Sequence, residues 1–179
     1  MHVKATLILG FAATVFAACA SRPPTAEHVT AIPPAVSGDS TVVEAARPTA
    51  RSMNAQRSEV AFTALSLIGT PYAAEGASPA EGFDCSGLVT YVYARALQLA
   101  LPRHTTDLAR SGVPVAPADL QPGDLVFYDT SHRPFSHVGI YLGESRFVHA
   151  PSTGGVVRVE NMRVGYWTKR FNGARRVVQ

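Results

Sequence analysis

The sequence predicts an α+β fold in which N-terminal helices pack on a small antiparallel sheet. Two observations indicate this class. Apolar residues at helical spacing come first, between residues 58 and 97, and short β-branched or aromatic runs between turn residues follow after residue 122. Helices and strands that are separated along the chain and joined by short connections are typical of an α+β domain. We expect one domain over 56–179, which is long enough for a single hydrophobic core.

Two helices are expected at the start of this domain. The first, 58–68, begins at Ser58 as a capping residue and ends before Gly69, and the second begins at Asp84 and continues to Leu97. Short strands then follow. They are expected at 125–128, 137–142, 146–150 and 156–160, with a last strand at 175–178.

The N-terminal residues 1–18 predict an export signal. Their apolar run, 5–18, is shorter than the roughly 20 residues that span a membrane. The end of this run and Cys19 resemble the lipobox of bacterial lipoproteins, which implies that the signal is removed and Cys19 is lipidated. Ala20 then implies an outer-membrane lipoprotein that faces the periplasm. The alternative is a plain secretory signal and a soluble periplasmic chain, so we expect an exported protein in both cases.

The stretch 19–55 predicts a disordered linker that begins at the lipidated Cys19. Prolines recur in it among Ser, Thr and Ala, and no helical or strand period persists, so it has little apolar surface to bury. A tether of this kind would let a domain reach from a membrane surface to a cell-wall polymer.

Composition excludes several classes of protein. The formal net charge of +3 is mildly basic and does not indicate a nucleic-acid partner. Two cysteines are too few for a disulfide scaffold, and no C-x-x-C pair suggests a zinc or redox site. We expect no metal and no cofactor, and we expect a monomer.

The C-terminal stretch 158–179 is more basic than the rest of the chain. Such a stretch would attract an anionic wall polymer. The alternative is a solvated face or a protected edge strand. The basic residues, set against the single acid Glu160, are Arg158, Arg163, Lys169, Arg170, Arg175 and Arg176.

Cys85 lies at the predicted start of the second helix and is the first candidate catalytic residue. A helix N-terminus carries unpaired N–H groups and a partial positive charge, which stabilise a thiolate and the oxyanion of an acyl-transfer intermediate. With Cys19 lipidated, Cys85 has no thiol partner in the chain. The alternative is a buried cysteine that acts as a small hydrophobic residue.

His137 and His149 are candidates for the general base that a cysteine nucleophile needs. His137 introduces one predicted strand and His149 ends the next. If the two strands form a hairpin centred on Gly143, the two histidines face each other across the strands. One ring would take the thiol proton and the other would orient it. The alternative is two histidines that only satisfy local polar groups.

Tyr72 lies in a stretch rich in Gly and Pro before the cysteine. Its hydroxyl would be able to donate to an oxyanion. The alternative is an ordinary amphipathic tyrosine that packs its ring.

Short motifs follow one another along 69–151. They are GTPY (69–72), GFDCSGLV (82–89), LPR (101–103), LQPGDLVFY (120–128), HVGIYLG (137–143) and HAP (149–151). In this order and at these spacings they resemble the NlpC-type cell-wall cysteine peptidases. The resemblance implies a reduced papain-like domain.

The same resemblance implies a role for each candidate residue. Cys85 matches the nucleophile, His137 the base, His149 the residue that orients the imidazole, and Tyr72 the tyrosine near the oxyanion. Two places, 73–76 and Leu108, depart from the family pattern in regions that flank its substrate groove.

The implied function is that of a peptidoglycan endopeptidase. Its partners would be stem peptides, and the bond would be D-γ-glutamyl to diamino acid or the D-Ala to diaminopimelate cross-link. The alternatives are a catalytically silent wall-binding or scaffolding lipoprotein, and an amidase or acyltransferase that uses the same thiol.

Overall fold

The computed structural model describes residues 49–152 and 154–179. The expected signal 1–18, the lipidation site Cys19 and the expected linker up to residue 48 lie outside the described residues. Among the helices that are described, none has the length and apolar character needed to cross a membrane.

Two long helices precede all six strands of the main sheet. The helices are α1 (Ala50–Leu65) and α2 (Cys85–Leu97). A small hairpin before α2 consists of β1 (Ala77–Ser78) and β2 (Gly82–Phe83), and the shorter helices are α3 (Thr105–Leu108), the 3-10 turn η1 (Pro117–Asp119) and α4 (Gly165–Thr168). The sheet strands are β3 (Val113–Val115), β4 (Leu125–Tyr128), β5 (His137–Gly143), β6 (Arg146–His149), β7 (Arg158–Asn161) and β8 (Phe171–Arg176).

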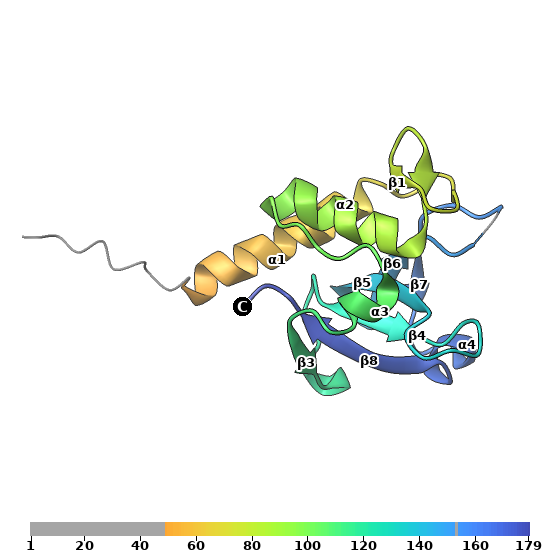
Figure 1. The fold of residues 1–179 in the computed structure, drawn as a ribbon. Coiled ribbons are helices and arrows are strands. Elements are labelled where there is room, and N and C mark those ends of the chain that lie inside the picture. The colour runs from red at the N-terminus through yellow and green to blue at the C-terminus, as the bar shows by residue number, and fades with distance from the viewer. Residues whose placement is uncertain (1–48, 153) are drawn as a thin grey trace, which may run out of the picture. The chain divides into compact units, whose positions relative to one another are not determined.

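The strands of the sheet pair antiparallel in the order β3-β8-β4-β5-β6-β7. The predicted α+β fold, with helices packed on an antiparallel sheet, is confirmed. Figure 1 shows α1 and α2 on one face of the sheet, with α4 near the end of β4 and β8.

The first helix begins earlier than predicted, at Ala50 and not at Ser58. Its cap is Thr49, whose hydroxyl accepts a hydrogen bond from the Ser52 amide at 3.2 Å. The first turns bury almost nothing, so they leave no apolar stripe that a sequence pattern detects. Capping and good helix formers extend the helix there, because neither requires a buried face.

The second helix begins where the sequence predicts it. Asp84 is the N-cap, and its carboxylate accepts a hydrogen bond from the Gly87 amide at 2.7 Å. An Asp at this position satisfies an amide that the helix leaves unpaired and complements the helix dipole. Cys85 is therefore fixed as the first residue of the helix.

The last strand is longer and more central than expected. It spans Phe171–Arg176 and lies between β3 and β4, so the protected edge strand anticipated for the basic C-terminal stretch is not β8. Arg175 donates to the carbonyl of Ala109 at 2.6 Å, and Arg176 is paired with Asp124. The edge strands of the sheet are β3 and β7.

The sheet buries side chains on both faces. Helices α1 and α2 pack against β5 on one face, in a core that includes Val60, Leu88 and Ile140. A smaller cluster on the other face includes Tyr128 and Trp167. The first residues of β5 contact both clusters, because Val138 packs in the first and His137 lies against Trp167 of the second.

Candidate active site

Cys85 is half-buried at the N-terminus of α2, and its sulfur lies against the start of β5. Burial raises the pKa of the Cys85 thiol, and the neighbouring Asp84 charge adds to the rise. The backbone N–H groups of Val138, Ser86 and Cys85 itself lower the pKa. The helix amides thus act as the sequence predicts, but burial outweighs them, and the resting thiol is protonated at neutral pH.

His137 and His149 are joined by a hydrogen bond between Nε2 of His137 and Nδ1 of His149, at 2.7 Å. Both rings are buried, with 4% and 0% of their surface exposed. Burial lowers the pKa of His137 to about 4. Burial also lowers the pKa of His149, as do the nearby charges of His137 and Arg158. Both imidazoles are therefore neutral at pH 7.

The register between β5 and β6 differs from the predicted one. Ile140 pairs with Val148 and Tyr141 with Phe147, so the two histidines are diagonal neighbours across the ladder. The hairpin closes at Glu144 and Ser145, which both have positive φ, as a two-residue turn requires. The predicted turn centre at Gly143 was wrong for this reason.

The rings still meet because the strand leaves room between them. A Cβ atom added at Gly139 would lie 2.6 Å from the Phe147 ring and 3.3 Å from the Cβ of His149. The missing side chain at Gly139 therefore permits the diagonal contact, and the predicted pairing of His137 with His149 is present as a direct hydrogen bond.

Trp167, which the sequence analysis did not single out, covers the two histidines. Its ring stacks on His137, with centroids 5.9 Å apart, and stands edge-on to His149 at 5.0 Å. An apolar cover of this kind excludes water and strengthens the hydrogen bond beneath it. Nε2 of His149 is buried and has no hydrogen-bond partner among the described residues. The one sequence signal for this role is that Trp167 is the single tryptophan of the chain.

Tyr72 lies beside the same helix start. Its amide donates to the carbonyl of Gly155 at 2.8 Å, and a parallel bridge links it to Phe83, two residues before Cys85. Burial, then the charges of Asp84 and Cys85, raise the pKa of Tyr72. The hydroxyl therefore stays protonated and is available as a donor.

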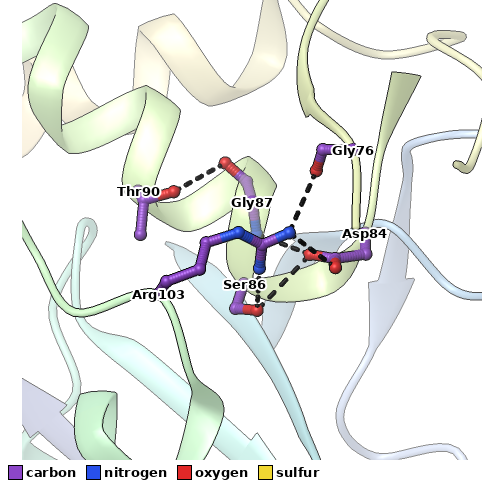
Figure 2. A network of polar contacts seen from close by, with 6 residues as sticks. All are labelled: Gly76, Asp84, Ser86, Gly87, Thr90 and Arg103. Atoms are coloured by element: carbon purple, nitrogen blue, oxygen red, sulfur yellow. Dashed lines mark hydrogen bonds and ion pairs between the residues drawn. The ribbon is translucent and has the colours of Figure 1, made fainter. Parts of the chain in front are cut away.

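Arg103 links the two residues that flank Cys85 (Figure 2). Its Nη2 atom donates to Asp84 at 2.7 Å, and its Nη1 atom donates to the Ser86 hydroxyl at 2.6 Å. A longer contact, 3.4 Å, reaches the carbonyl of Gly76. The sequence predicted Arg103 only as part of a motif, because its partners are distant along the chain.

Two depressions open near the start of β5. One, of about 570 Å³, is lined by Cys85, Arg103 and Ser136. The other, of about 530 Å³, is lined by His137, Arg158 and Trp167. Of the two places that depart from the family pattern, 73–76 reaches the first depression through Glu75, whereas Leu108 is fully buried in the core.

Within 49–152 and 154–179, no cluster of three or more His, Cys, Asp or Glu side chains has a geometry that would hold a metal ion. The chemistry that the arrangement supports is nucleophilic. A thiol on a helix start, backbone N–H groups aimed at its sulfur and a neutral imidazole on the adjacent strand are the parts of an acyl-transfer site.

Comparison with known proteins points in the same direction. The profile of the NlpC/P60 family matches residues 69–176. The chain is 38% identical over 117 residues to the murein DD-endopeptidase MepH of Escherichia coli, covering 64% of this chain and 43% of MepH. It is 42% identical to the gamma-DL-glutamyl hydrolase of Bacillus subtilis, covering 61% of this chain and 26% of the relative. It is 44% identical to a probable endopeptidase of Haemophilus influenzae, covering 61% and 67%. The chain thus spans less than half the length of the first two relatives.

Solved structures agree with the sequence comparison. An NlpC/P60 family protein from Bacillus cereus matches with a TM-score of 0.64 and 29% identity, covering 69% of this chain and 40% of that one. The NlpC/P60 domain of the peptidoglycan hydrolase SagA matches with a TM-score of 0.59 and 30% identity, covering 67% of this chain and 97% of the domain.

Proposed function

Because the chain belongs to the NlpC/P60 family, we propose that it is a cysteine endopeptidase that hydrolyses an amide bond in peptidoglycan stem peptides or cross-links. Its fold is the reduced papain-like fold of that family. The observation that carries the proposal is that the Cys85 thiol and the His137–His149 pair both lie at the start of β5. The Cys85 sulfur lies against the amide of Val138, and the residue before it, His137, is hydrogen-bonded to His149.

The nucleophile is Cys85 and the base is His137. Because Nε2 of His137 is bound to His149, Nδ1 is the ring nitrogen left to accept the thiol proton. Cys85 and His137 share no hydrogen bond among the described residues, and such contacts are often long in ligand-free enzymes. Since burial opposes both charged forms, the proton moves as the sulfur attacks and not in the resting enzyme.

The reaction then follows acyl transfer. The sulfur bonds to the amide carbonyl carbon, and the carbonyl π electrons move to the oxygen. The Cys85 amide and the Tyr72 hydroxyl stabilise that oxyanion. When the tetrahedral intermediate collapses, the C–N bond breaks and the leaving amine takes the proton from His137. Water hydrolyses the resulting thioester and restores the thiol.

The two depressions would hold the two sides of the scissile amide bond. The acyl part would lie in the depression lined by Cys85, and the leaving amine would lie in the one lined by His137, which protonates it. That second depression offers both charges, because Arg158 and Glu160 form an ion pair there at 2.8 Å. A diamino acid with a free amino group and a free carboxylate, as follows the D-γ-glutamyl bond in an uncross-linked stem peptide, would match it. The diaminopimelate of a D-Ala cross-link would offer only the carboxylate.

The place of the protein in the cell is part of the proposal. We retain an export signal at 1–18 and lipidation at Cys19. The linker, predicted to end at residue 55, stops before α1 begins at Ala50, and the catalytic domain continues from there to residue 179. Cleavage of a wall polymer requires a location outside the cytoplasm, and a lipid anchor in the outer membrane would present a monomeric domain to the periplasm.

The test is product analysis on purified soluble muropeptides by mass spectrometry. The full chain is expected to cleave one amide bond, Cys85→Ala is expected to abolish cleavage, and Cys19→Ala, the matched removal of the other thiol, is expected to retain it. Cleavage by Cys85→Ala would overturn the proposal. An intact substrate with all three proteins would favour the silent wall-binding reading, and transfer of the acyl group to an added amine would favour an acyltransferase.

A further inference from the structure

We propose that Arg103 is a positioning residue for Cys85, which clamps the residues on both sides of the nucleophile and offsets the carboxylate charge beside it. The inference rests on the proposed function only for the identity of the nucleophile. Its physical content, the environment of one thiol, is measured without any substrate.

The first support is geometric. One guanidinium binds Asp84 at 2.7 Å through Nη2 and Ser86 at 2.6 Å through Nη1, so it spans the residues immediately before and after Cys85 (Figure 2). Asp84 is also the N-cap that fixes the helix start. A planar fork that holds both neighbours restricts where the intervening residue lies. Lysine, with a single ammonium group, cannot form the same two-nitrogen fork.

The second support is the loop that the same arginine contacts. Arg103 reaches the Gly76 carbonyl at 3.4 Å. That carbonyl lies so close to the first turn of α2 that a Cβ atom at Gly87 would be 2.0 Å from it. Arg103 therefore connects the loop, the N-cap and the residue after the nucleophile in one network.

The third support is electrostatic. The Asp84 charge adds to the burial that raises the pKa of Cys85. The pKa of Arg103 is raised first by its hydrogen bond to Asp84 and also by the negative charges of Asp84 and Cys85. Because such coupling is reciprocal, the guanidinium favours the Cys85 thiolate.

The other groups near the sulfur do not replace this charge. Of the described residues that line the pocket, Glu75 and Asp84 are acids and His104 is an exposed histidine. His137, on β5, lines the other depression and is neutral, and the pKa of Tyr72 is raised. Arg103 is thus the permanent cation of this pocket lining, set against two carboxylates.

The experiment measures the rate of alkylation of Cys85 by iodoacetamide against pH, read by mass spectrometry on the peptide that contains Cys85. Arg103→Gln is expected to raise the apparent pKa of the thiol by about one unit, and to slow alkylation at neutral pH roughly tenfold. Asp84→Asn, which keeps a capping side chain, is expected to lower it. The double variant, which removes both charges, is expected to return it close to the wild-type value. Arg103→Lys is expected to restore part of the shift, because it restores the charge and not the fork.

A matched control separates this effect from loss of structure. Arg176→Gln breaks an equivalent pair with Asp124 away from the thiol, and it is expected to leave the titration of Cys85 unchanged. The proposal is overturned if Arg103→Gln leaves the thiol titration unchanged, or if the double variant shifts it as far as Arg103→Gln does. Failure to cleave muropeptides would sink the proposed function while leaving this titration result intact, so the two failures are distinguishable.

Discussion

Two arginine–aspartate pairs of this fold share their chemistry and differ in their neighbours. Arg103 and Asp84 meet at 2.7 Å beside Cys85, with 36% and 17% of their side chains exposed. Arg176 and Asp124 also meet at 2.7 Å, but their side chains are only 20% and 1% exposed. The second pair is a bidentate fork that ties β8 to the turn before β4. An arginine–aspartate pair is thus expected to contribute mainly to stability where it is buried, at Arg176 and Asp124. Beside the thiol, at Arg103 and Asp84, it is expected to act on the reactivity of the sulfur.

The rate of muropeptide cleavage should differ most between variants of the candidate active site and variants of the Arg176–Asp124 pair. His137→Ala removes the proposed base and is expected to lower the rate of muropeptide cleavage by about a thousandfold or more. His149→Ala is expected to lower the rate only about tenfold, because His149 orients the base and does not transfer the proton. Arg176→Gln is expected to retain cleavage at temperatures where it is folded. The rates are read from product formation by mass spectrometry, and equal rates for wild type and His137→Ala would contradict the role of His137 as the base.

The free energy of unfolding should depend more on the Arg176–Asp124 pair than on the Arg103–Asp84 pair. Arg176→Gln leaves the Asp124 carboxylate buried without its cation, and the free energy of unfolding is expected to fall by about 3 kcal/mol. Arg103→Gln breaks a more exposed pair and is expected to cost about 1 kcal/mol. Urea unfolding followed by circular dichroism measures both. A larger loss for Arg103→Gln would contradict the division of roles.

Low pH is expected to destabilise the folded protein through the buried imidazole of His137. The folded pKa of His137, about 4, lies below its ordinary value of 6.5, so the unfolded chain binds more protons between these two values. The free energy of unfolding should therefore fall as the pH falls through this window, by about 3 kcal/mol from His137. Urea midpoints at pH 7 and pH 4 test this. In His137→Gln the acid-dependent loss should shrink, and an unchanged loss would show that the buried imidazole does not cause it.

The smallest expected effect concerns the loop at Gly76, whose carbonyl Arg103 contacts. Gly87→Ala places a methyl group 2.0 Å from the Gly76 carbonyl, and is expected to cost about 2 kcal/mol. It leaves both charges in place, so it should shift the thiol titration less than Arg103→Gln does. Gly165→Ala, whose added methyl meets nothing within 4 Å, is the matched control and should stay within about 0.5 kcal/mol of wild type. Thermal melts and alkylation of the same samples provide both readouts.

Local signals predicted the part of the site that lies on single elements. The Asp84 cap marks the start of α2, and the apolar run 125–128 marks β4, because capping and strand patterns are written in consecutive residues. His137 and His149 were paired correctly as neighbours, although the register was wrong. A hairpin register depends on the turn that closes it, and two non-glycine residues with positive φ give no strong turn signal.

Contacts between residues that are far apart along the chain could not be predicted from the sequence. Arg103 reaches Asp84 from a separate loop, and Trp167 reaches the histidines from α4, on the other face of the sheet. Neither contact has a local pattern, because tertiary packing alone brings these residues together. The raised pKa of Cys85 has the same origin: the helix start is visible in sequence, and the burial that outweighs it is not.

The central claim is that the Cys85 sulfur is the nucleophile, and stoichiometric inactivation tests it most directly. The folded Cys19→Ala chain is alkylated in steps with iodoacetamide, and each sample is assayed on muropeptides while mass spectrometry gives the labelled fraction of Cys85. Residual cleavage is expected to fall in proportion to that fraction and to reach zero at full labelling. Full cleavage by a completely labelled protein would contradict the account.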